Sequence, residues 1–132
     1  MTWFAGSVLL LVILCVSTAV DKVTLELRYQ RATLTPSRGS SVKLSCNAVY
    51  NSKLCGLLHV VWCQDSTELT EPRKYFTTVN ETISGRDMRR RQVVTEILDL
   101  TSKDSGRYQC TAKCAKSQEA AVGVTITIDV KE

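Results

Sequence analysis

Apolar and polar residues alternate along several short segments of the chain. Residues 42–46 are Val-Lys-Leu-Ser-Cys, and residues 58–63 are Leu-His-Val-Val-Trp-Cys. A period of two is expected where one face of a β-strand is buried and the other meets water. The pattern predicts strands at 23–28, 42–46, 58–64, 93–97, 106–112 and 122–130. We therefore expect an all-β chain.

The same period assigns side chains to the two faces of each predicted strand. On the strand at 58–64, His59, Val61 and Cys63 fall on the outer face, so Cys63 is predicted to lie outside the core. The predicted inward residues are Val23, Leu25, Leu27, Val42, Leu44, Cys46, Leu58, Val60, Trp62, Val93, Thr95, Ile97 and, just past that strand, Leu100.

Segments of other character separate these strands. Residues 35–40, Thr-Pro-Ser-Arg-Gly-Ser, predict a turn, and residues 48–57 predict a loop. About thirty residues lie between Cys63 and Val93, and this stretch is predicted to hold further strands at 74–77 and around Val79.

The N-terminal residues have the pattern of a secretory signal peptide. Residues 8–16 are an unbroken apolar run of nine, and Ser17, Thr18 and Ala19 are small residues at the positions that a signal peptidase reads. A run of nine is too short to span a bilayer, although a membrane anchor is the alternative. We expect a signal peptide at 1–19 and one domain at 20–132.

Composition agrees with a secreted domain. Removing the signal would remove Cys15 and leave five of the six cysteines, which a small secreted chain uses chiefly for disulfides. The 17 basic and 13 acidic residues give a net charge of +4, which favours solubility and not a polyanionic partner. No nucleic-acid partner is expected.

One motif is specific. Asp104, Gly106, Tyr108 and Cys110 form D-x-G-x-Y-x-C; Cys46 lies 64 positions before Cys110, and Trp62 follows Cys46 by 16. This combination resembles the core of an immunoglobulin-superfamily domain. The resemblance implies a Cys46–Cys110 disulfide between two sheets, with the tryptophan packed on it and the Tyr108 hydroxyl bonded to the backbone.

The resemblance also implies the architecture. We expect an immunoglobulin-like β-sandwich of two antiparallel Greek-key sheets, with Asp104 and Gly106 at the corner before strand F. The long stretch before Val93 has room for strands C′, C″ and D, which favours a variable-type or intermediate set. The last strand lacks the Phe-Gly-x-Gly segment of rearranging antigen receptors, which favours a fixed receptor-like domain. The core residues expected are Cys46, Cys110, Trp62, Tyr108, Leu44 and Leu100.

Three further cysteines distinguish the chain from a generic sandwich. Strands C and F are antiparallel neighbours in this architecture, which places Cys63 roughly 10 Å or more from Cys114, too far for a disulfide. Cys55 and Cys114 belong to the B–C and F–G loops, which share one end of the sandwich. We therefore predict a Cys55–Cys114 disulfide that clamps two recognition loops.

Cys63 is then the odd thiol. It could link two chains in a covalent dimer or join a second subunit, or it could remain a shielded free thiol. A zinc site built from Cys55, His59, Cys63 and Cys114 is a further alternative, but the spacing is not that of a zinc finger and an oxidising compartment favours disulfides. No metal or cofactor is expected.

A narrower resemblance surrounds Trp62. Residues 61–64, Val-Trp-Cys-Gln, resemble strand C of B and T lymphocyte attenuator and of the polymeric immunoglobulin receptor and its leukocyte relatives. In those families the cysteine after the tryptophan bridges to the C–C′ region, whereas no cysteine occurs here between Cys63 and Cys110. The attenuator likeness implies a lymphocyte co-receptor that binds a tumour-necrosis-factor-receptor family member.

Other polar features point to surface roles. His59 is the only histidine and has no triad partners, so an enzyme is not expected. Asn80 begins an Asn-Glu-Thr sequon and is a candidate glycosylation site. The basic run at 86–91 could contact acidic glycans or lipid headgroups, but a solvated edge with one Arg–Asp104 ion pair is favoured.

These features predict an extracellular domain that recognises another protein, either as an immune receptor ectodomain or as its soluble form. The predicted surface is the G-F-C-C′ face or the loops that carry Cys55 and Cys114. A secreted single domain and the ectodomain of a longer membrane receptor remain alternatives, as does an adhesion or accessory subunit tethered through Cys63. A non-covalent dimer is also open.

Overall fold

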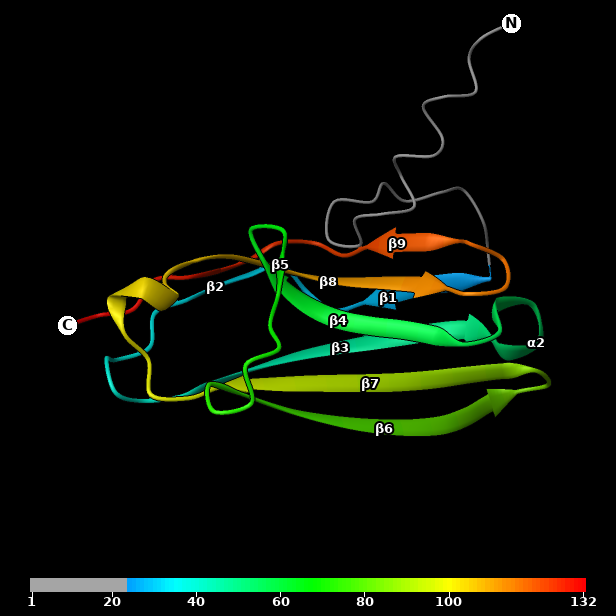
Figure 1. The fold of residues 1–132 in the computed structure, drawn as a ribbon, viewed down its shortest axis with the longest axis horizontal. Helices are drawn as coiled ribbons and strands as arrows, with labels where there is room; N and C mark the ends of the chain where they lie inside the picture. The colour runs from blue at the N-terminus through cyan, green and yellow to red at the C-terminus, as the bar shows by residue number, and fades with distance from the viewer. Residues whose placement is uncertain (1–23) are drawn as a thin grey trace, which may run out of the picture.

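The computed structural model describes residues 24–132, and the predicted signal peptide lies outside them. Two sheets pack face to face, and their strands pair antiparallel except for β2 and β10, which are parallel (Figure 1). The first has the order β1-β3-β7-β6, and the second has β2-β10-β8-β4-β5 with β9 paired to β8. The strands are β1 Leu25–Arg28, β2 Ala32–Leu34, β3 Val42–Asn51, β4 Leu58–Gln64, β5 Thr67–Glu68, β6 Tyr75–Gly85, β7 Met88–Ile97, β8 Gly106–Cys114, β9 Ala120–Val122 and β10 Ile126–Ile128.

The helical content is small. A single turn, α2 (Ser52–Cys55), lies between β3 and β4, and a 3₁₀ turn, η1 (Ser102–Asp104), precedes β8. Within residues 24–132 no helix is both long and apolar enough to cross a membrane.

The centre of the sandwich is a disulfide with a tryptophan beside it. Cys46 on β3 is bonded to Cys110 on β8, with a Cα–Cα distance of 6.4 Å. Trp62 on β4 lies opposite Cys110 in the strand register and is fully buried. The predicted core residues Leu44, Leu100 and Tyr108 are also buried. The alternating pattern therefore located the inner faces of these strands.

Tyr29, between β1 and β2, joins this centre from the N-terminal side. Its ring lies 5.0 Å from the Trp62 ring, centroid to centroid, and its hydroxyl accepts the Cys110 N–H at 3.0 Å. The same hydroxyl donates to the Val124 carbonyl. A Cβ on Gly123 would collide with the Tyr29 ring, so this close approach requires glycine.

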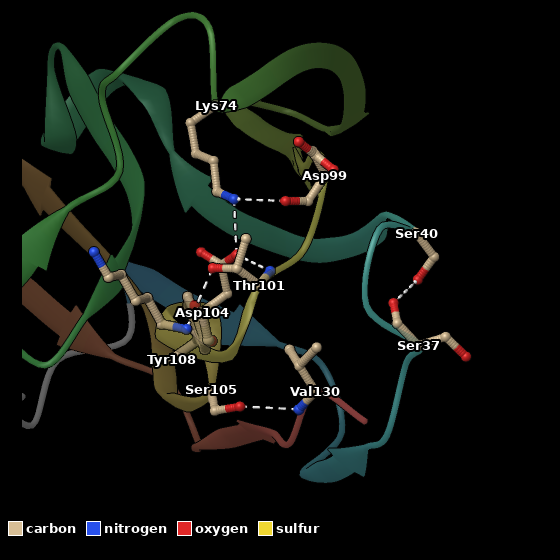
Figure 2. A network of polar contacts seen from close by, with 10 residues as sticks. Ser37, Ser40, Lys74, Asp99, Thr101, Asp104, Ser105, Tyr108 and Val130 are labelled. Atoms are coloured by element: carbon tan, nitrogen blue, oxygen red, sulfur yellow. Dashed lines mark hydrogen bonds and ion pairs between the residues drawn. The ribbon is translucent and has the colours of Figure 1, made fainter. Parts of the chain in front are cut away.

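The corner before β8 is a connected set of polar contacts (Figure 2). The Tyr108 hydroxyl donates to the Asp104 carbonyl at 2.6 Å, and the Asp104 carboxylate accepts the Thr101 N–H at 2.8 Å. Lys74 donates to the same carboxylate at 2.7 Å. The expected Arg–Asp104 pair is therefore wrong, because Lys74, the residue just before β6, forms the ion pair with Asp104 instead. Gly106 begins β8 with a positive φ of 155°.

The basic run contributes instead to a contact between the sheets. Arg91 on β7 binds Glu81 on β6 at 2.7 Å and donates to the carbonyl of Leu58 on β4. The Tyr50 hydroxyl also donates to Glu81, and the Arg91 guanidinium lies 5.6 Å from the centre of the Tyr50 ring. Charge and hydrogen bonds therefore join the two sheets here, beside the buried apolar cluster that includes Tyr50 and Leu58.

Three predictions about strand boundaries are wrong. The single strand predicted at 122–130 is divided into β9 and β10, because Gly123 and Val124 contact Tyr29 between them. Residues 74–79 do not form separate C′ and C″ strands, since Tyr75–Gly85 is one strand, β6, that pairs with β7 in the other sheet. In the described residues the C′ position is filled only by β5, two residues long. The predicted loop at 48–57 is shorter than expected, because β3 continues to Asn51.

We expect Tyr108→Phe to lower the free energy of unfolding by about 1–3 kcal/mol, because it leaves the buried Asp104 carbonyl without its donor. Burial and the charge of Asp104 raise the pKa of Tyr108 far above its usual range, so the hydroxyl stays a donor at physiological pH. Urea denaturation measures the loss. Lys103→Ala, an exposed side chain of the same turn, is the control, and equal effects of the two changes would refute the assignment.

We expect Glu81→Gln to lower stability by about 1 kcal/mol at neutral pH, because the variant loses a charged hydrogen bond. Burial raises the pKa of Glu81. Hydrogen bonds from Tyr50 and Arg91 and the positive charges of Arg91 and Arg89 lower this pKa by more than burial raises it, so the net shift is downward.

A lowered folded-state pKa means that the contribution is present above the unfolded pKa, about 4.3, and is lost as pH falls through the folded value. Urea denaturation of parent and variant at pH 7, 5 and 3 should show the gap closing at the lowest pH. Glu26→Gln, which removes an exposed ion pair with Arg28, serves as the control and should have no measurable effect. A gap of the same size at pH 3 and pH 7 would contradict the account.

Candidate functional site

Three connections meet at one end of the sandwich, which we call the loop end. It comprises residues 52–57 between β3 and β4, residues 115–119 between β8 and β9, and the turn between β6 and β7 (Figure 1). The strands run into this end from both sheets, so its position is fixed by the fold.

The first connection is the α2 turn. The Asn51 side chain accepts the Leu54 N–H at 3.0 Å and caps the start of the turn. Gly56 ends the turn with a φ of 76°, and a Cβ there would lie 2.7 Å from the Cβ of Lys116. Glycine is therefore needed at position 56, both for its backbone conformation and for the close approach of the neighbouring loop.

A disulfide and two hydrogen bonds tie the first connection to the second. Cys55 is bonded to Cys114 with a Cα–Cα distance of 4.8 Å, and both residues are fully buried. The Ala115 N–H donates to the Leu57 carbonyl and the Lys116 N–H to the Cys55 carbonyl, each at 2.8 Å. The structure thus joins the cysteines that the strand geometry paired.

The third connection is held to the first through Ser52. Its N–H donates to the Asp87 carbonyl at 2.8 Å, and its hydroxyl donates to the same oxygen at 3.2 Å. The loop end is therefore one rigid unit, with each connection bonded to the α2 turn.

The loop end exposes apolar and basic groups. Leu57 is 82% exposed and Leu54 is 49% exposed, although the Leu54 N–H is bonded to the Asn51 cap and the Leu57 carbonyl to the Ala115 N–H. Lys53 and Lys116 lie beside them, and the Lys116 ammonium donates to the Lys53 carbonyl at 3.3 Å. Composition and strand alternation did not predict that these leucines and lysines form an exposed surface. The Cys55-Gly56 pair, which marks a tight and cross-linked turn, was the sequence signal for it.

Cys63 lies on the outer face of β4, opposite Gln109, as the alternation predicts, but it is not an exposed thiol. Only 2% of its surface is exposed, its sulfur lies 3.6 Å from the Thr111 hydroxyl, and none of the described cysteines is a free thiol. The prediction of a leftover thiol is therefore wrong. The alternation assigns a side chain to a face of the sheet but does not say whether that face is covered, and Thr111 beside it is also fully buried.

Residues 24–132 contain no group of three or more His, Cys, Asp or Glu side chains that could hold a metal ion. The zinc alternative is wrong because Cys55 and Cys114 are joined to each other. His59 is exposed on β4, and its Nε2 lies 3.7 Å from a carboxylate oxygen of Glu68.

Asn80 lies midway along β6 and is exposed. Its neighbour Glu81 points inward to Tyr50 and Arg91, so Asn80 is on the outer face of the four-stranded sheet. A glycan at this position would cover that face and leave the loop end open. Glycosylation at Asn80 stays a prediction.

Comparison with known proteins agrees with this architecture. An immunoglobulin domain family model matches residues 32–122, which is more than half of the chain. Among solved structures, an IgNAR antibody domain C3 is similar with a TM-score of 0.57 and 18% sequence identity, covering 83% of this chain and 100% of that one. At this identity the likeness concerns the fold alone. A search of curated proteins found no match.

The family match covers the motif from Asp104 to Cys110, the Trp62 that packs beside the Cys46–Cys110 disulfide, and most strands of both sheets. The chain belongs to the immunoglobulin domain family.

Proposed function

We propose that the chain is an extracellular recognition domain that binds another protein through its loop end. The observation that carries this proposal is the combination of a rigid backbone with exposed leucines and lysines at the same place. A surface that is ordered before binding loses less conformational entropy when the partner docks. The Cys55–Cys114 disulfide supplies much of that order.

The chemistry of the loop end indicates the kind of partner. Leu54 and Leu57 provide apolar contact area, and Lys53 and Lys116 provide positive charge beside it. A protein surface with an apolar hollow and an acidic rim would be complementary to this arrangement.

The compartment follows from the cysteines. Disulfides persist in oxidising environments, and this chain has two between described residues. Immunoglobulin domains commonly mediate protein–protein contacts. Together with the predicted signal peptide at 1–19, these features support an immune receptor ectodomain, or its soluble form, on the cell surface or in secretions.

The tethered accessory subunit is not proposed. That alternative requires an accessible thiol at Cys63, and Cys63 is buried and is not a free thiol in the structure.

Staining of leukocytes with the tetramerised secreted domain tests the proposal. On a cell type that the parent stains, we expect Leu57→Asp and Lys116→Glu each to reduce staining at least tenfold, because they remove apolar contact and reverse a charge at the loop end. Their melting temperatures should match the parent, since both side chains are exposed.

Lys43→Glu is the matched control, because Lys43 is an exposed lysine on β3, away from the loop end. It should stain as the parent does. Undiminished staining by both loop-end variants, or equal loss with Lys43→Glu, would show that binding uses another surface.

A further inference from the structure

The edge of the four-stranded sheet is open along β6. This strand has 11 residues and pairs only with β7, and no described strand lies beyond it (Figure 1). The other strands at sheet edges, β1, β2, β5 and β9, are only two to four residues long. A long edge strand presents unpaired N–H and C=O groups that can pair with another strand.

Lysine, arginine and proline, which commonly protect such an edge, are missing from β6, and its one irregularity lies near its end, between Ile83 and Gly85. Its sequence is Tyr-Phe-Thr-Thr-Val-Asn-Glu-Thr-Ile-Ser-Gly. Its only charge, Glu81, is turned inward and neutralised by Arg91. Three large apolar side chains are exposed on it instead: Phe76 at 58%, Val79 at 60% and Ile83 at 77%.

We propose that β6 pairs with β6 of a second copy of this chain, antiparallel and with the two-fold axis at Val79. The register between β6 and β7 is regular from Tyr75 to Ile83 and shifts between Ile83 and Gly85. Val79 is the midpoint of that regular segment. A two-fold dimer formed in this way would extend each four-stranded sheet into one continuous sheet.

The side chains are self-complementary in this register. On the inward-pointing face, Val79 lies opposite Val79, and Tyr75 lies opposite Ile83 at both ends, so apolar groups meet apolar groups. Glu81 lies opposite Thr77 and meets no like charge. Moving the axis to Glu81 would oppose two carboxylates, and moving it to Asn80 would place Val79 against Glu81. Of these three axes, the one at Val79 opposes no like charges, keeps apolar groups opposite apolar groups and is centred on the regular segment.

The sequon lies beside this axis. In the proposed register the two Asn80 residues are diagonal neighbours on the outer face, with Cα atoms roughly 7–8 Å apart. Two glycans there would crowd each other. The proposal is therefore tested in the glycan-free variant Asn80→Gln, secreted from the same host.

Light scattering after gel filtration, over a wide concentration range, gives the first readout. We expect Asn80→Gln to show twice the monomer mass, and Asn80→Gln with Val79→Lys to return to the monomer mass. Val124→Lys is the control, since Val124 is an exposed valine between β9 and β10, outside β6, and its dimer should persist. A monomer at every concentration, or a dimer unaffected by Val79→Lys, would overturn the proposal.

Cross-linking under non-reducing conditions gives the second readout and tests the register. Val79→Cys in the Asn80→Gln chain should form a covalent dimer, because the two Cα atoms would be within disulfide range. Thr77→Cys should not, since the two Thr77 residues would lie roughly 13 Å apart along the strands. Equal cross-linking of both variants, or cross-linking of Thr77→Cys alone, would refute the Val79 axis.

Discussion

The disulfide between Cys46 and Cys110, with Trp62 against it, is the constraint on which the sandwich depends. It joins β3 in one sheet to β8 in the other, and its sulfurs are fully enclosed. Closing a loop of this length removes freedom from the unfolded chain, on the order of 4 kcal/mol in the loop-entropy model. Because the two sheets are fixed here, the connections at the loop end can carry other functions.

The loop end has its own small core. Cys55, Cys114, Tyr50, Leu58 and their neighbours form a buried cluster separate from the one around Trp62. Arg91 and Glu81 border this cluster and bridge β7 and β6 to the start of β4. The second disulfide therefore acts locally, on the shape of the surface that we propose for recognition.

The sequence predicted much of the fold, because strand alternation and the corner motif report local chemistry directly. The buried inner faces and the pairing of Cys55 with Cys114 follow from the strand period and the sheet order. What the sequence could not predict depends on long-range packing: the burial of Cys63, the pairing of β6 with β7, and the choice of Lys74 as the partner of Asp104. The exposed leucines were missed because exposure of a loop side chain leaves no periodic signal.

Amide hydrogen exchange of the secreted protein and its Cys55→Ser/Cys114→Ser variant tests the central claim most directly. If the core disulfide fixes the sandwich and the second one only orders the loop end, the amides of Ala115 and Lys116 will lose protection in the variant. The amide of Cys110, bonded to Tyr29, will keep it. Loss of protection at Cys110 as well, or unchanged protection at Ala115 and Lys116, would contradict this division between frame and recognition surface.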